Sequence, residues 1–193
     1  MTRRVIVAAL CALAAVVAAA PALADEGAAW AALRAGGVVA LMRHGDAPGA
    51  GDPPGWRLDD CATQRNLDAA GRAQARALGA KIRAERIPVR RVLASPWCRT
   101  IETASLLDVG AVEKEPAFAN AFILSDRRDE LASVARAVIG RWRGPGALVV
   151  VTHGENIRGL IGRTPGTAEL VVVSLAEDGR LREVRAVLTP PSR

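Results

Sequence analysis

The 193-residue sequence is poor in aromatic residues and contains no tyrosine. Aromatic residues make up only 3% of the chain, so its apolar half must build a core mainly from alanine, valine, leucine and isoleucine. Proteins that bind single-stranded nucleic acid combine basic grooves with aromatic side chains on which bases stack. No segment of this sequence interleaves aromatic and basic residues in that way, and we therefore expect no nucleic-acid partner.

Histidine and cysteine are also scarce, with two and three residues respectively. The sequence has no cysteine cluster, no carboxylate cluster and no third histidine, whereas a catalytic zinc site usually takes three protein ligands. We therefore expect no metal site and no cofactor. The net charge of +6 comes almost entirely from arginine. Guanidinium groups suit a solvated surface, and they also suit a pocket that binds phosphate.

The first 24 residues have the pattern of a secretory signal peptide. Arg3-Arg4 precedes a long apolar stretch, and Ala22-Leu23-Ala24 has the A-x-A form of a cleavage site. An uncleaved membrane anchor is the alternative, but the apolar stretch is short for a bilayer. We expect a cleaved signal peptide at 1–24 and a single domain at 25–193. The mature protein is then periplasmic or secreted, with no stable membrane insertion.

Export would place the remaining cysteines in an oxidising compartment. Cleavage removes Cys11 and leaves one pair, Cys61 and Cys98. We predict a disulfide between these two residues. Two buried free thiols are the alternative.

Predicted strands and helices alternate along the mature chain. Apolar runs predict strands at 38–42, 89–94, 109–114, 147–152, 170–175 and 180–188. Helical periodicity and capping residues predict helices at 26–34, 69–86, 96–107, 129–143 and 155–161. Such alternation is typical of a doubly wound layout with right-handed crossovers. We predict an α/β fold, a three-layer α/β/α sandwich with a mostly parallel sheet.

Two of the predicted strands end in a histidine followed by a glycine. Arg43-His44-Gly45 follows the first strand, and His153-Gly154 follows the fourth. A histidine that merely caps a strand is the alternative for each, although the repeated context favours a shared site. In open α/β sheets ligands bind at the carboxyl ends of the strands. We expect both histidines to lie at one edge of the sheet.

Arg99 is predicted to lie beside them, in the first turn of a helix. Ser95-Pro96 has the form of an N-cap followed by proline at the first helical position. An arginine in a first turn opposes the helix dipole, and a bound phosphate would remove that conflict. A solvent-exposed Arg99 is the alternative, because the cost of such a surface charge is small.

Histidines beside arginines suit phosphoryl transfer. Neutral imidazole is a competent nucleophile, and arginine forks bind tetrahedral oxyanions through paired charge-assisted hydrogen bonds. Phosphoryl transfer needs little beyond positioning and charge neutralisation. These residue types therefore predict transfer through a phosphohistidine without a metal.

Three motifs in this order resemble the histidine phosphatase superfamily, also called phosphoglycerate mutase-like. They are Arg43-His44-Gly45, the segment 95–104 with its Arg-Thr-x-x-Thr-Ala pattern, and Val151-Thr-His153-Gly154. Segment 67–75 is similar to the first helix of that family, and the resemblance extends over most of 38–161. Cys61-x-Thr-Gln-Arg-Asn-Leu and Pro-Trp-Cys-Arg resemble exported bacterial members, which include lipopolysaccharide-core heptose phosphatases.

The resemblance implies a role for each matching residue. His44 would be the phosphorylated nucleophile, and Arg43, Arg99 and His153 would bind and neutralise the phosphoryl group. Arg65 would add a contact on the substrate side.

The general acid of the reaction is not fixed by these motifs. A carboxylate usually protonates the leaving oxygen and then activates water. Glu155 is our first choice because it lies two residues after His153. Asp46 and Asp126 are the alternatives.

These features predict an exported phosphoric monoester hydrolase whose substrate is a small-molecule or glycolipid phosphoester. Two other functions stay open. One is a phosphatase for phosphoamidates such as phosphohistidine, because some relatives lack the acid. The other is a non-catalytic periplasmic module that binds an anionic glycolipid through its basic residues.

Overall fold

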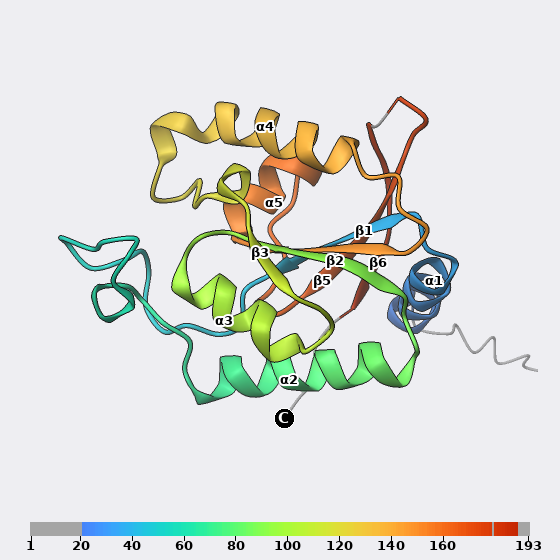
Figure 1. The fold of residues 1–193 in the computed structure, drawn as a ribbon, viewed down its shortest axis with the longest axis horizontal. Helices are drawn as coiled ribbons and strands as arrows, with labels where there is room; N and C mark the ends of the chain where they lie inside the picture. Colours follow the sequence, from blue (N-terminus) through green and yellow to red (C-terminus); the bar gives the residue numbers. More distant parts are fainter. Residues whose placement is uncertain (1–20, 179, 189–193) are drawn as a thin grey trace, which may run out of the picture.

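The computed structural model describes residues 21–178 and 180–188. It has a six-stranded sheet at its centre (Figure 1). Its order is β3-β2-β4-β1-β5-β6. Strands β1 to β4 pair in parallel, whereas β5 is antiparallel to both β1 and β6. The predicted mostly parallel sheet is therefore confirmed. The strands are β1 (Val38–Arg43), β2 (Val89–Ala94), β3 (Val112–Lys114), β4 (Ala147–Thr152), β5 (Leu170–Leu175) and β6 (Leu181–Leu188).

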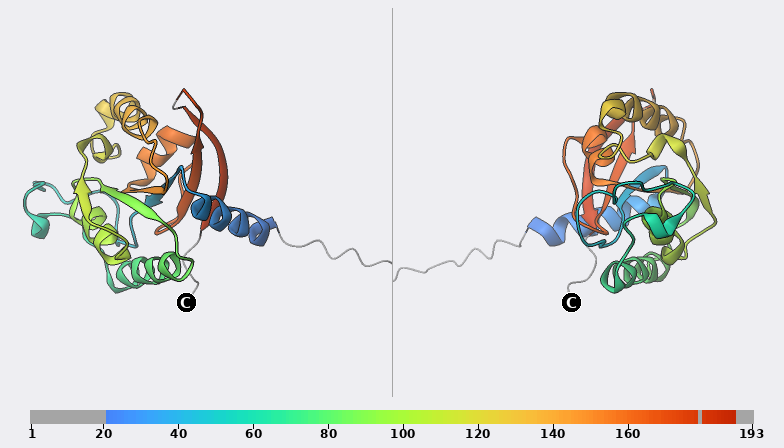
Figure 2. Two further views of the ribbon diagram at one scale, coloured as in Figure 1. Left: turned by 45° about the vertical axis from the view of Figure 1, so that its right-hand side comes forward. Right: turned by 90° about the vertical axis from the view of Figure 1, so that its left-hand side faces the viewer.

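Helices cover both faces of this sheet (Figure 2). They are α1 (Pro21–Ala35), α2 (Ala69–Ala84), α3 (Cys98–Leu107), α4 (Arg128–Gly140) and α5 (Gly154–Ile161). One apolar core joins the sheet to α1, α2 and α3, and a second joins the opposite face to α4 and α5. The three-layer α/β/α sandwich is therefore as predicted. Most of the predicted signal peptide, 1–20, and the tail 190–193 lie outside the described residues.

Strands β1 and β4 lie side by side at the centre of the sheet, and their register positions the histidines. Arg43 pairs with Thr152 at the last register position. The backbone N–H of His44 then donates to the carbonyl of Thr152 over 3.0 Å. His44 and His153 are thus the first residues beyond two adjacent parallel strands, at the same edge.

Helix α2 packs closely against α3, and its buried face differs in part from the one that the sequence pattern predicts. Helical periodicity predicts an apolar side made of Ala73, Ala77, Leu78 and Ile82. Leu78 and Ile82 are buried as predicted, but the other buried residues of α2 are Gly71, Ala75 and Gly79 and not Ala73 and Ala77. A Cβ atom at Gly79 would lie 2.0 Å from the carbonyl oxygen of Leu107 in α3. The backbones of the two helices lie too close for a side chain at this position, so glycine is required there. Glycine and alanine have little hydrophobic character, so the hydrophobic pattern of the sequence does not indicate this contact.

We expect Gly79→Ala to destabilise the protein by roughly 2 kcal/mol, even though alanine is the better helix former. The new methyl group meets backbone on α3, which can move only if the two helices separate. Gly27→Ala is the matched control, because a Cβ there has nothing within 4 Å. Urea unfolding of both variants measures the difference, and equal stabilities would show that the helices separate at no cost.

Helix α3 begins later than predicted. Its first residue is Cys98 and its N-cap is Trp97, whose side chain makes no capping hydrogen bond. The backbone of Trp97 is extended and β2 ends at Ala94, so Ser95, Pro96 and Trp97 form a short connection between β2 and α3. Ser95 is therefore not the N-cap, and its hydroxyl is free to contact a histidine. Other boundaries also differ from the prediction: α1 begins at 21, β3 lacks 109–111, α2 ends at 84 and α4 spans 128–140.

A long loop, residues 46–60, projects from the body between β1 and α2 (Figure 1). It has no helix or strand, as its content of glycine, proline and aspartate predicted. A disulfide joins Cys61, just after the loop, to Cys98 at the start of α3, with 5.7 Å between the Cα atoms. This is the pairing expected from the sequence, and it fixes the end of the loop beside α3. No helix of the described residues is both long and apolar enough to span a membrane.

Candidate active site

A cavity of about 360 Å³ opens at the carboxyl edge of β1 and β4. Its walls come from the ends of these strands, the loop 46–60, α3, the start of α5 and three connecting segments that contribute Arg65, Asn120 with Phe122, and Thr164 with Thr167. The residues that carry chemistry along its lining are Arg43, His44, Asp46, Arg65, Arg99, His153 and Glu155. The structure therefore brings the residues expected for phosphoryl transfer, and two of the three candidate acids, into one cavity.

His44 is buried, and its hydrogen bond determines which ring nitrogen can react. Nδ1 lies 2.8 Å from the carbonyl oxygen of Gly45. A carbonyl can only accept, so Nδ1 carries the proton and Nε2 keeps its lone pair. Burial lowers the pKa of His44 to about 3, further helped by the charges of Arg99, Arg65 and Arg43 and opposed by the Gly45 hydrogen bond. The ring is therefore neutral at neutral pH, as a nucleophile requires.

His153 lies beside it, with 5.5 Å between the two ring centroids. Its Nε2 lies 2.9 Å from the Ser95 hydroxyl, and Trp97 packs edge-on against the ring at 5.6 Å. Burial lowers the pKa of His153 well below its usual value, and repulsion from His44, in its protonated form, and from Arg99 lowers this pKa further. If the hydroxyl donates to Nε2, the proton of His153 sits on Nδ1. That atom is buried and has no hydrogen-bond partner among the described residues.

Arg43 reaches the cavity from the end of β1. Its Nη1 donates to the carbonyl of Pro165 over 3.0 Å, which anchors one side of the guanidinium. Its Nε is buried and unpartnered among residues 21–178 and 180–188. A Cβ at Gly154 would lie 3.6 Å from this Nε, so Arg43 sits directly against the first residue of α5.

Arg99 is fully buried, contrary to the alternative of a solvent-exposed side chain. Its guanidinium forms a bidentate ion pair with Asp52 of the loop, at 2.7 and 3.2 Å. Its Nε finds no hydrogen-bond partner within the part of the chain that the structure describes. Arg99 therefore has one edge bonded to protein and one edge without a partner.

Arg65 lines the cavity too, but much of its bonding capacity is directed to the loop. Its Nε donates to the carbonyl of Gly51 over 2.8 Å, and its Nη1 donates to the carbonyl of Ala47. Burial, together with the charge of Arg99, lowers the pKa of Arg65. The structure thus places Arg65 at the site, where it holds the shape of the cavity wall.

The three candidate acids do not share one location. Glu155 and Asp46 line the cavity, whereas Asp126 is exposed and lies outside its lining. The Glu155 side chain is 20% exposed and is 3.8 and 3.6 Å from Arg128 and Arg158. Geometry therefore favours Glu155 or Asp46 as the acid over Asp126.

Sequence reasoning missed several residues of this site. Asp52 contacts Arg99, and the Ser95 hydroxyl contacts His153. Neither contact has a local sequence signal. Asn120 lines the cavity and accepts from the backbone N–H of Phe122. The composition of segment 115–128 favours packing through its two phenylalanines, Phe118 and Phe122. Phe118 is fully buried, whereas Phe122 is 55% exposed and lines the cavity.

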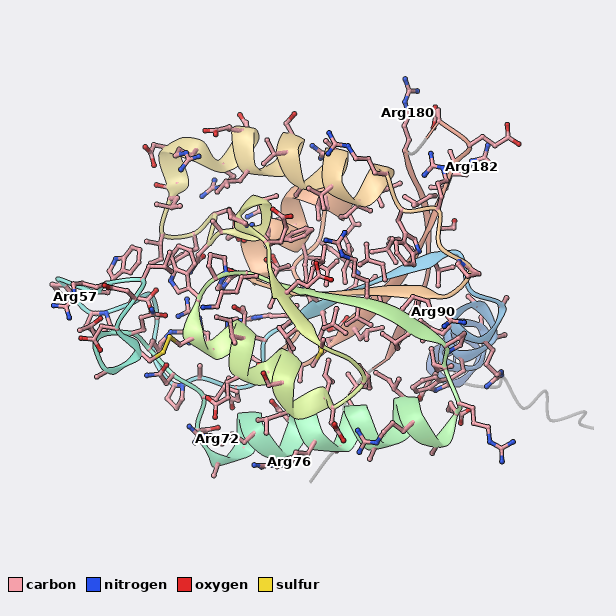
Figure 3. The ribbon with its side chains drawn as sticks, in the orientation of Figure 1. Arg57, Arg72, Arg76, Arg90, Arg180 and Arg182 are labelled. Carbon is pink, nitrogen blue, oxygen red and sulfur yellow. A yellow bond between two sulfur atoms is a disulfide. The ribbon has the colours of Figure 1, made fainter. Side chains whose placement is uncertain are left out.

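Most other arginines lie away from the cavity. Figure 3 shows six of them spread over the loop, α2, β2 and the β5–β6 hairpin: Arg57, Arg72, Arg76, Arg90, Arg180 and Arg182. They form the solvated surface that the basic composition allowed. Within 21–178 and 180–188, no group of three or more histidine, cysteine or carboxylate side chains could hold a metal ion.

Comparison with known proteins agrees with this picture. The sequence model of the histidine phosphatase superfamily (branch 1) matches residues 39–123, a segment that includes His44 and Arg99. No curated protein matches the chain in sequence. The matched segment is similar to this family and spans less than half of the chain.

Solved structures share the fold at low sequence identity. The protein histidine phosphatase SixA, in complex with tungstate, has a TM-score of 0.56 and 22% identity over 79% of this chain and 97% of its own. The mycobacterial glucosyl-3-phosphoglycerate phosphatase has a TM-score of 0.58 and 18% identity, over 77% and 98%. A phosphoserine phosphatase from Entamoeba histolytica, with 3-phosphoglyceric acid bound, has 0.54 and 14%, over 75% and 93%. At these identities the likeness establishes the fold.

Proposed function

We propose that the chain is an exported phosphatase that hydrolyses phosphomonoesters through a phosphohistidine on His44, without a metal. One observation carries this proposal. The free Nε2 of His44 shares a cavity with Arg43, Arg99 and His153, and each of these three has a buried ring or guanidinium nitrogen without a partner in the described residues. Buried polar groups normally have partners, so three such nitrogens around a nucleophile indicate a bound oxyanion.

The first step transfers the phosphoryl group to His44. The Nε2 lone pair attacks phosphorus in line with the leaving oxygen, forming the P–N bond as the P–O bond breaks. The guanidinium groups of Arg43 and Arg99 neutralise the phosphoryl oxygens, and His153 donates one further hydrogen bond. In the same step, Glu155 gives a proton to the leaving alkoxide.

The second step hydrolyses the intermediate. The Glu155 carboxylate, now unprotonated, takes a proton from water, and the resulting hydroxide attacks phosphorus. The P–N bond breaks, His44 regains its neutral ring and inorganic phosphate leaves. Two arginines supply the charge stabilisation that a metal supplies in other phosphoryl transfer enzymes, so the proposed chemistry needs no metal.

The exported location and the substrate belong to the same proposal. The signal-peptide pattern of 1–24 supports export to the periplasm or beyond. The resemblance of segments 61–67 and 96–99 to lipopolysaccharide-core heptose phosphatases supports a phosphorylated sugar or glycolipid as the substrate. Phosphoamidate hydrolysis is the less favoured activity, because Glu155 lies in the cavity where a phosphoester requires an acid.

The test uses purified residues 25–193 with para-nitrophenyl phosphate in the presence of EDTA. We expect turnover that the chelator does not reduce. During turnover, denaturation at alkaline pH should trap a phosphoryl group on the peptide that contains His44. Loss of activity in EDTA would contradict metal independence. Tight polyanion binding without turnover of any phosphoester would support the binding module instead.

Glu155→Gln is expected to slow turnover of alkyl phosphates by about 100-fold, within the range typical of general acid catalysis. Phosphates with good leaving groups, such as para-nitrophenol, should lose far less, because their leaving oxygen needs little protonation. The measurement is kcat for a series of leaving groups, with Asp46→Asn in parallel. If only Asp46→Asn shows the leaving-group dependence, Asp46 is the acid and Glu155 is not.

A further inference from the structure

The carboxylate of Asp52 is buried against Arg99, although it belongs to the loop 46–60. Its side chain has no exposed surface. It accepts hydrogen bonds from Nη1 and Nη2 of Arg99 at 2.7 and 3.2 Å, and from the Trp97 indole at 2.9 Å. The backbone N–H of Arg65 donates to it as well, over 2.9 Å. Four donors from three residues converge on one loop carboxylate.

The hydrogen bonds of Arg99 show which edge of its guanidinium is left. The planar group carries five N–H bonds. Nη1 donates to Asp52 and to the carbonyl of Arg65, at 3.1 Å, and Nη2 uses one N–H on Asp52. The Nε–H and the second N–H of Nη2 remain, and these two point the same way. Such an edge matches two oxygens of a phosphate.

Asp52 itself does not line the cavity, whereas Arg99 does. The carboxylate therefore lies on the side of the guanidinium away from the substrate space. Because the ion pair is bidentate, it fixes both the position and the rotation of the guanidinium plane. Without it, the long side chain of Arg99 would have only the Arg65 carbonyl to orient it.

We propose that Asp52 is a positioning residue that turns the Nε–Nη2 edge of Arg99 towards the phosphoryl group. The inference rests on the proposed function and assigns a further residue to the same site. It also ties the loop to the chemistry, because residues 47–51 form a wall of the cavity and Asp52 follows them directly. The loop and the phosphate-binding arginine are then positioned together.

The charge state of Asp52 agrees with this role. Burial raises its pKa, but the hydrogen bonds from Arg99 and Arg65 and the charge of Arg99 outweigh burial, so the pKa lies below the usual aspartate value. The carboxylate is therefore ionised at neutral pH and binds Arg99 as a charged pair. A carboxylate can also compete with phosphate for an arginine, and the experiment separates these two roles.

The test compares Asp52→Asn with the wild type in para-nitrophenyl phosphate turnover and in binding of inorganic phosphate. Asparagine keeps the size but loses the bidentate ion pair. We expect kcat/KM to fall by about 10- to 100-fold, as small misplacements in a site do, and phosphate to bind about tenfold more weakly. Asp59→Asn is the matched control, because it removes the same charge from an 88% exposed position in the same loop. It should behave as wild type.

Two further variants show that the effect acts through Arg99. Trp97→Phe removes one hydrogen bond to Asp52 and keeps an aromatic ring, so it should give a smaller loss in the same direction even if Asp52→Asn folds poorly. In an Arg99→Lys background, which lacks the fork, Asp52→Asn should cost little more. A purely structural role for Asp52 would instead make the two losses add.

Each outcome decides the inference. Unchanged phosphate affinity in Asp52→Asn overturns it, and tighter phosphate binding shows a competing carboxylate instead. If the wild type turns over no phosphoester but its phosphate affinity depends on Asp52, the positioning role stands and the proposed function falls. If the wild type binds no phosphate, both are wrong.

Discussion

His44→Ala is expected to reduce turnover of any phosphoester by roughly 10³-fold or more, as removal of a covalent nucleophile does in other enzymes. The hydrogen bonds of the two histidines give the reason. The Gly45 carbonyl holds the proton on Nδ1, so Nε2 is the only ring nitrogen of His44 with a lone pair to give. No other side chain of the cavity that the structure describes offers an equivalent nucleophile, because Nε2 of His153 is bonded to Ser95.

Phosphate binding separates the loss of chemistry from a loss of the site. The arginines remain in His44→Ala, so inorganic phosphate should still bind, within about tenfold of the wild-type affinity. Trapping at alkaline pH should recover no phosphoryl group. His153→Ala is the comparison, because it removes a binding group and leaves the nucleophile, so its phosphohistidine should still form slowly. Turnover of His44→Ala within a factor of ten of wild type would exclude the phosphohistidine mechanism.

The sequence predicts that the two histidines lie at the same edge of the sheet, because each of them directly follows a predicted strand. Both follow an apolar run of nearly equal length, and adjacent parallel strands end at the same edge. In the structure β1 and β4 are direct neighbours, which brings the two histidines together. The motif around Arg99 and the even pair of cysteines are similarly local signals.

Features that depend on close approach or on loops could not be predicted. The sequence predicts a helix that starts at Pro96 because serine and proline have strong local preferences, yet α3 begins at Cys98, after a Trp97 whose backbone is extended. Asp52 is one of four aspartates in 46–60, and nothing in their spacing indicates which one reaches Arg99. Loop conformation is set by long-range partners, here by Arg65 and Arg99, and these partners lie on other elements.

Acidification from pH 7 to pH 5 is expected to cost the fold roughly 2 kcal/mol through His44 alone. Its pKa is about 3 in the folded protein against a usual 6.5, so between these values the unfolded chain binds a proton that the folded chain does not. Stability from this group is fully present above pH 6.5 and falls as the pH approaches 3. His153 is shifted in the same direction and adds to the loss.

Urea unfolding at pH 7 and pH 5 measures this effect, and His44→Gln isolates it. The variant has no titrating group at 44, so acidification should lower its stability less than that of the wild type. The difference should be about 1.4 kcal/mol per pH unit below pH 6, which is the contribution of one proton. Asp52 does not interfere, because its pKa lies below the usual aspartate value and therefore below this window. Equal losses in both proteins would mean that His44 is protonated in the fold. A protonated ring has no lone pair to attack phosphorus, so the same titration that measures stability also tests the nucleophile.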